Sequence, residues 1–70
     1  MDRQEHLEWA KKRAAEYLDD GDPAQAYASF VSDCRKHPDL NYNSFLFAMG
    51  LNPIYQTSVP KMREFINGFN

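Results

Sequence analysis

Apolar residues recur at helical spacing from the start of the chain, which predicts a first amphipathic helix over residues 3–20. Asp2 can cap this helix, and Glu5 three residues later completes a capping box. Gly21 is a suitable stop because glycine takes left-handed backbone geometry without strain. The apolar stripe consists of Leu7, Ala10, Ala14, Tyr17 and Leu18.

A second helix is predicted over residues 23–36. Asp22 is its cap, Pro23 suits the first helical position, and Gln25 completes a second capping box. Pro38 ends the helix, because the residue before a proline is pushed out of helical geometry. The two-residue connection makes the two helices an antiparallel hairpin. The second stripe consists of Ala26, Tyr27, Phe30, Val31 and Cys34.

After a turn at residues 39–41, the segment 42–49 is apolar on nearly all sides, and Gly50 closes it. A short helix of this kind is normally the buried one, so we expect it inside the fold. Its first face holds Tyr42, Phe45, Leu46 and Met49, and its other side holds Phe47 and Ala48.

Residues 51–58 are interpreted as a connector. Ser58 can cap a last helix, Pro60 is tolerated in its first turn, and Gly68 ends it. No segment shows the strict alternation of a strand. The sequence therefore predicts one all-α domain over residues 1–70: a small bundle of four helices, with a hairpin and two shorter helices. The apolar face of the last helix consists of Val59, Met62, Phe65, Ile66 and Phe69.

The aromatic content, the net charge and the single cysteine indicate a small core and exclude some classes of partner and compartment. Ten aromatic residues can fill the core of a 70-residue chain. The net charge of -2 argues against nucleic-acid binding, which needs surplus Lys and Arg. One cysteine allows no internal disulfide, which suits a reducing compartment. A polar N-terminus and the lack of a long apolar run favour a protein that stays in the cytoplasm and enters no membrane.

Two candidate ion sites are weak. Cys34 and His37 share a helical face, but the chain lacks the further ligands that zinc needs. We therefore favour core packing for Cys34, and for His37 a contact with the negative end of the second helix. The acidic residues on either side of Gly21 do not continue into a calcium loop, because Pro23 interrupts the pattern. These acidic residues are Asp19, Asp20 and Asp22.

No spacing indicates a catalytic triad or a phosphate-binding loop, so we expect a protein that is not an enzyme and holds no metal or cofactor. Trp9 is the informative residue, since it lies about 200° around the first helix from Leu7. There are two alternatives. Either the last helix packs over Trp9 and buries it in the core, or the indole is exposed and contacts another protein. The second alternative predicts a protein-binding surface of His6, Trp9, Lys12, Arg13 and Glu16.

The hairpin resembles a single tetratricopeptide motif, which implies the same antiparallel geometry. The resemblance lies in Gly21-Asp22-Pro23-Ala24-Gln25-Ala26-Tyr27-Ala28-Ser29-Phe30 followed by Pro38, and in Ala14 and Tyr17 of the first helix. Two positions depart from the motif: Arg13 and Asp33 stand where it expects apolar or small residues.

Both ends of the chain also resemble a family of short bacteriophage proteins without an assigned activity. The matching residues are His6-Leu7-Glu8-Trp9-Ala10-Lys11-Lys12-Arg13-Ala14, Glu16-Tyr17, Gly21-Asp22, Ser32-Asp33, Lys36-His37-Pro38 and Arg63-Glu64-Phe65-Ile66-Asn67-Gly68-Phe69-Asn70. Residues 39–57 depart from that pattern. The resemblance implies a small phage accessory protein. We therefore expect an interaction module that binds and modulates or inhibits a host protein in the bacterial cytoplasm; the alternative is a self-associating assembly protein of the phage.

Overall fold

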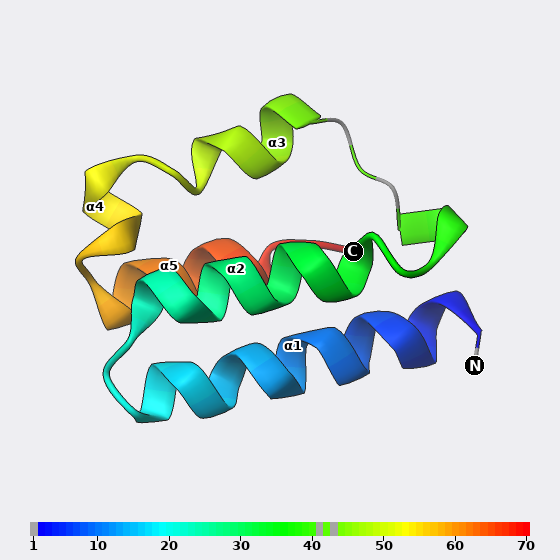
Figure 1. Cartoon of the computed structure of the whole chain (residues 1–70), viewed down its shortest axis with the longest axis horizontal. Coiled ribbons are helices and arrows are strands. Elements are labelled where there is room, and N and C mark those ends of the chain that lie inside the picture. The colour runs from blue at the N-terminus through cyan, green and yellow to red at the C-terminus, as the bar shows by residue number, and fades with distance from the viewer. Residues whose placement is uncertain (1, 41, 43) are drawn as a thin grey trace.

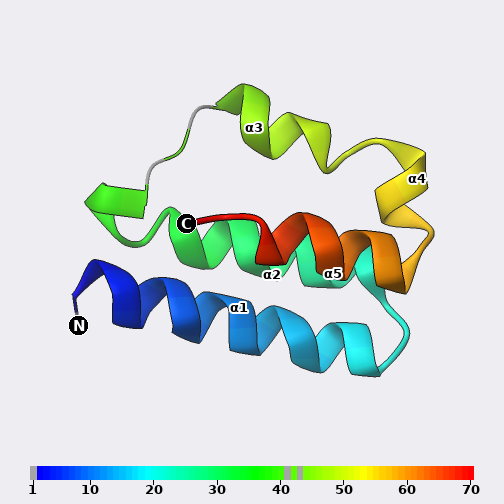
Figure 2. The same cartoon turned by 180° about the vertical axis from the view of Figure 1, so that it is seen from behind.

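Helices α1 (Arg3–Asp19) and α2 (Pro23–Cys34) form the predicted antiparallel hairpin (Figure 1). The structure is a computed structural model that describes residues 2–40, 42 and 44–70. The last long helix, α5 (Val59–Asn67), lies against both helices of the hairpin, as the view from behind also shows (Figure 2). Every regular element in the described residues is helical, which confirms the predicted all-α class.

The predicted caps position the hairpin. The Asp2 carboxylate accepts the Glu5 backbone N–H at 2.8 Å, and the Asp22 carboxylate accepts the Gln25 N–H at 3.1 Å. Each bond satisfies an amide that a helix start leaves without an intrahelical partner. Between the two helices, Gly21 has φ +77°, a left-handed conformation that glycine adopts at low cost. The turn predicted at this glycine is confirmed.

Helix α2 ends at Cys34, two residues before its predicted end. The backbone amides of Lys36 and His37 reach back only three residues, to the carbonyls of Asp33 and Cys34, at 3.2 and 3.1 Å. Such bonds tighten the last turn into 3₁₀ geometry ahead of a proline. The chain then continues into a 3₁₀ turn, η1 (Pro38–Leu40).

The core lies where α1, α2 and α5 meet. Three alanines, Ala10, Ala14 and Ala26, are fully buried and let the two helices of the hairpin approach closely. Larger side chains fill the remaining space. The other buried apolar residues are Leu7, Leu18, Phe30, Cys34, Leu40, Phe47, Met62, Ile66 and Phe69.

The expectation that the third helix is buried was wrong. Helix α3 (Ser44–Met49) contributes only Phe47 to the core, while Phe45, Leu46 and Met49 are exposed. The Phe47 ring stacks on Phe69 with centroids 5.7 Å apart. Three residues of the predicted face, Phe45, Leu46 and Met49, therefore face solvent, and the fourth, Tyr42, packs against the core ahead of the helix.

The predicted connector contains a further helical turn, α4 (Pro53–Gln56). The Asn52 side chain caps it by accepting the Ile54 N–H at 3.0 Å, and Pro53 occupies the first helical position. The Asn-Pro pair repeats the Asp22–Pro23 signal that starts α2. The described residues therefore form five α-helices, where we expected four.

Candidate protein interface

Trp9 lies half-buried beside α2 and the turn that follows it. The Arg13 guanidinium carbon is 5.0 Å from the Trp9 ring centroid, and the Lys36 ammonium is 5.6 Å from it. The His6 ring meets the indole edge-on at 5.1 Å. Cations over an indole face are attracted by the electron-rich face of the neutral aromatic ring. Three of the five residues predicted to bind a partner, His6, Trp9 and Arg13, thus contact one another within this chain.

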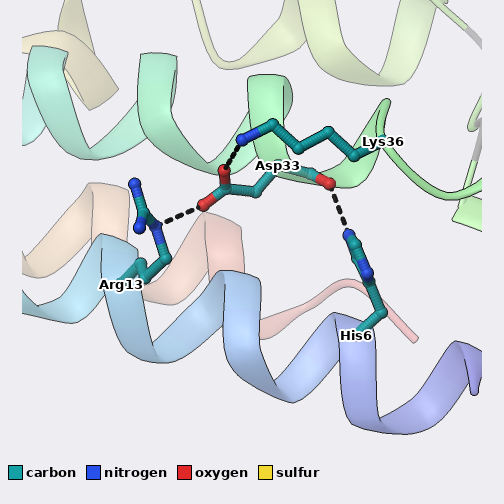
Figure 3. A network of polar contacts seen from close by, with 4 residues as sticks. All are labelled: His6, Arg13, Asp33 and Lys36. Atoms are coloured by element: carbon teal, nitrogen blue, oxygen red, sulfur yellow. Dashed lines mark hydrogen bonds and ion pairs between the residues drawn. The ribbon is translucent and has the colours of Figure 1, made fainter. Parts of the chain in front are cut away.

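The centre of this cluster is Asp33, which was not among the residues of the predicted binding surface. Asp33 is 1% exposed. Arg13 Nε donates to Asp33 Oδ2 at 2.8 Å and Lys36 Nζ donates to Oδ1 at 3.1 Å (Figure 3). His6 Nε2 donates to the Asp33 backbone carbonyl at 2.6 Å. A buried carboxylate needs such partners, so the cluster ties α1 to α2.

The two departures from the tetratricopeptide pattern are therefore partners of each other. Arg13 of α1 and Asp33 of α2 form an ion pair across the hairpin, at 2.8 Å. Lys12 and Glu16, the other two residues of the predicted surface, are exposed on α1. The predicted surface consequently has a half-buried part that stabilises the hairpin and an exposed part that faces solvent.

Two of the three acidic residues around Gly21 make contacts that stabilise the fold. Asp22 caps α2, and Asp19 accepts a hydrogen bond from Arg63 of α5 at 3.1 Å. His37 Nδ1 accepts the Asp39 N–H at 3.1 Å, and the His37 ring lies 5.2 Å from that of His6. Among the residues that the structure describes, no group of three or more His, Cys, Asp and Glu side chains could hold a metal ion.

Cys34 packs in the core, as predicted, and its thiol is expected to be unreactive. Burial raises the pKa of Cys34 from the ordinary 9.0 to about 11, and the nearby Asp33 charge adds to this increase. At pH 8, the reactive thiolate is then about one hundredfold rarer than for an ordinary thiol. We expect Ellman's reagent to label Cys34 far more slowly in buffer than in guanidinium chloride; equal rates would contradict its burial.

A surface on the other side of the molecule was missed by the sequence analysis. Five large apolar side chains of α3, α4 and the residue Leu51 between them are 43–71% exposed. Scattered exposed apolar residues are common, but a contiguous group marks a contact surface. We call it the α3–α4 surface, and it consists of Phe45, Leu46, Met49, Leu51 and Ile54.

The α3–α4 surface lies in a part of the chain without charge. Between Asp39 and Lys61 the sequence contains no Asp, Glu, Lys, Arg or His. Depletion of charged residues is the compositional mark of the centre of a protein interface. This signal was available in the sequence, but the segment was assigned to the core because both buried helices and interfaces are apolar.

Two hollows adjoin this surface, and Met49 lines both. One, of about 350 Å³, lies between α3 and the end of α5 and is lined by Tyr42, Leu46, Phe65 and Phe69 among others. The other, of about 510 Å³, includes Leu51 and Ile54. Apolar hollows beside projecting side chains can receive the side chains of a partner.

The α3–α4 surface is attached to the core at defined points. The Tyr27 hydroxyl donates a hydrogen bond to the Phe47 carbonyl. Gly50, directly after α3, packs against the rings of Tyr27 and Phe65, and its carbonyl accepts Gln56 Nε2 at 2.6 Å. These contacts hold the two short helices against α2 and α5 and present the apolar side chains in a fixed arrangement.

Comparisons with protein-family models, with curated proteins and with solved structures find no match. The bacteriophage origin and the tetratricopeptide-like hairpin therefore stay predictions. In the described part of the chain, no helix combines the length and the apolar character needed to cross a bilayer.

Proposed function

We propose that this protein is a protein-binding module without catalytic activity, and that the α3–α4 surface is its principal contact. The exposure of five large apolar side chains in an uncharged segment carries the proposal. A soluble monomer gains nothing by leaving such a surface in water, whereas a partner that covers it removes apolar area from solvent.

The area is sufficient for a stable contact. At about 200 Å² for each large apolar side chain, the exposed fractions amount to roughly 500 Å² of apolar surface. Burying that area provides on the order of 10 kcal/mol at about 25 cal/mol per Å². The loss of translational and rotational freedom on association costs about 4 kcal/mol or more. An affinity of about tens of micromolar is therefore the expected range.

The partner that fits the resemblance to short phage proteins is a protein of the bacterial host, which the module binds and modulates or inhibits in the cytoplasm. The predicted surface on α1 provides a second contact for it, with Lys12 and Glu16 exposed. Both views of the molecule show α2 and α5 between α1 and α3 (Figures 1 and 2). The charged α1 face and the apolar α3–α4 surface are therefore accessible from opposite sides.

A photo-crosslinking side chain tests the proposal. We expect protein adducts from bacterial lysate when it replaces Ile54 or Lys12, and none when it replaces Ala28, which is exposed on α2. A captured protein, once purified, should bind the wild-type chain directly. Ile54→Lys or Lys12→Glu should weaken that binding at least tenfold. The absence of adducts at both positions, or binding that neither variant weakens, would contradict the proposed function.

A further inference from the structure

We infer that a second copy of this chain covers the α3–α4 surface, giving a symmetric homodimer. This inference rests on the proposed function, because it names one partner of the same surface. Three observations favour a second copy over a different protein: the apolar area, the absence of charge, and the presence of projecting side chains beside hollows.

The apolar area matches what a stable dimer needs. A standard interface buries about 800 Å² on each partner, and homodimer interfaces are about 65% apolar. The apolar part of such an interface is therefore about 500 Å² on each partner. The exposed apolar side chains of the α3–α4 surface provide roughly the same area. Neighbouring uncharged polar residues, such as Asn52 and Thr57, are exposed and can form the rim.

The absence of charge makes the surface compatible with itself. In a two-fold dimer, the same patch meets its own copy, so any unpaired charge near the axis faces a like charge. From residue 40 to residue 60 the chain has no Asp, Glu, Lys, Arg or His side chain that could cause this repulsion. A charged neighbour in space is Arg35 at the end of α2, whose guanidinium carbon lies 5.7 Å from the Phe47 ring centroid. The segment itself offers a partner no charge to pair with.

The surface combines an exposed side chain with a neighbouring hollow, the two features that a contact between identical surfaces needs. Phe45, 71% exposed, precedes Leu46, which lines the 350 Å³ hollow between α3 and α5. A cavity of about 150 Å³ already accommodates a benzene ring. A two-fold axis beside α3 would allow the Phe45 ring of each copy to enter the hollow of the other. Such reciprocal contacts are what an isologous interface requires.

Dimerisation would also explain how α3 is stabilised. A helix of six residues is too short to be stable alone in water. Within one chain its buried side chain is Phe47, and its other large side chains are exposed. A second copy would cover Leu46 and Met49, and the α1 faces would lie on the outside of the dimer. The dimer would then present two charged α1 faces to other proteins.

Sedimentation velocity over 1–500 µM tests the inference. We expect the wild-type chain to sediment as a dimer at tens of micromolar and to dissociate on dilution. Leu46→Lys and Ile54→Lys should each weaken dimerisation at least tenfold, since each buries an unpaired ammonium. The matched control is Gln4→Lys, which adds the same charge at an exposed position on α1 and should leave dimerisation unchanged. Unaltered far-UV circular dichroism verifies that all variants fold.

A wild-type chain that stays monomeric at 500 µM would overturn the inference. The inference would also be overturned if Leu46→Lys and Ile54→Lys formed dimers as stable as those of the wild type, because the dimer would then use another surface. Neither result touches the proposed function, which the adducts with other proteins at Ile54 and Lys12 test separately. Conversely, a dimer without any such adduct would support self-association through the α3–α4 surface and contradict the proposed binding of another protein.

Discussion

Replacing Arg13 by alanine is expected to lower the free energy of unfolding by about 2–3 kcal/mol. The cost arises at Asp33, whose carboxylate is 1% exposed and would keep only Lys36 as a charged partner. The lost bond joins Arg13 Nε and Asp33 Oδ2 at 2.8 Å, and a buried charge that loses its partner is strongly destabilising. Arg13 also covers the Trp9 ring, so the variant should expose the indole. Urea unfolding monitored by tryptophan fluorescence measures both effects.

A second ion pair is the matched control. Arg63 and Asp19 also form an ion pair, at 3.1 Å, but the Asp19 side chain is 73% exposed, whereas that of Asp33 is 2% exposed. Arg63→Ala should therefore cost only about 0–1 kcal/mol. The double variant Arg13→Leu with Asp33→Ala removes both charges and restores the apolar and small residues that the tetratricopeptide pattern expects. Its stability should lie within about 1 kcal/mol of wild type. Equal losses for Arg13→Ala and Arg63→Ala would contradict the role assigned to the buried pair.

Gly50→Ala is the other substitution with a large expected effect. An added Cβ would lie 2.4 Å from Tyr27 Cε1 and 2.7 Å from Phe65 Cε2, closer than any real carbon contact. The Phe65 ring is packed between Tyr55 and Phe69, at centroid distances of 5.1 and 5.2 Å. Because neither ring can move freely, we expect a loss of about 2–3 kcal/mol in thermal or urea unfolding.

Gly68→Ala is the control for this substitution. Its Cβ would meet the nearest atom, the Phe65 carbonyl oxygen, at an ordinary 3.4 Å, and its φ of -74° suits alanine. We expect a change within about 0.5 kcal/mol of wild type, or a small gain, because alanine restricts the unfolded chain more than glycine does. If Gly50→Ala were equally well tolerated, Gly50 could not be the point that holds α3 against the core.

The hairpin was predictable because its signals are local. The Asp2 and Asp22 caps, the turn at Gly21 and the stop before Pro38 each depend on a few neighbouring residues. The orientation of α3 was not predictable in the same way. A segment that is apolar on all sides does not specify which side faces the core, and the contact between Phe47 and Phe69 joins residues far apart in sequence.

The candidate sites show the same division between local and distant signals. The helical pattern correctly placed Trp9 away from the apolar stripe of α1. The pattern could not show that the Trp9 ring is half-buried, because the side chains that cover it, Arg13 and Lys36, are charged and were expected to face solvent. Arg13 and Asp33 could have been paired from the sequence, since both break the same motif on adjacent helices. The uncharged stretch between Asp39 and Lys61 was also visible, but only the structure shows that its large side chains are exposed.

The claim that the α3–α4 surface is a contact for another protein chain is tested most directly by NMR with a soluble paramagnetic probe. In dilute protein, the probe should broaden the methyl signals of Leu46, Met49, Leu51 and Ile54, and leave those of the buried Leu7 and Ile66 sharp. At several hundred micromolar, or with a captured partner, the first group should become protected. Two results would contradict this account. In one, the methyl signals of the first group are already protected in dilute protein; in the other, neither a higher concentration nor a partner protects them.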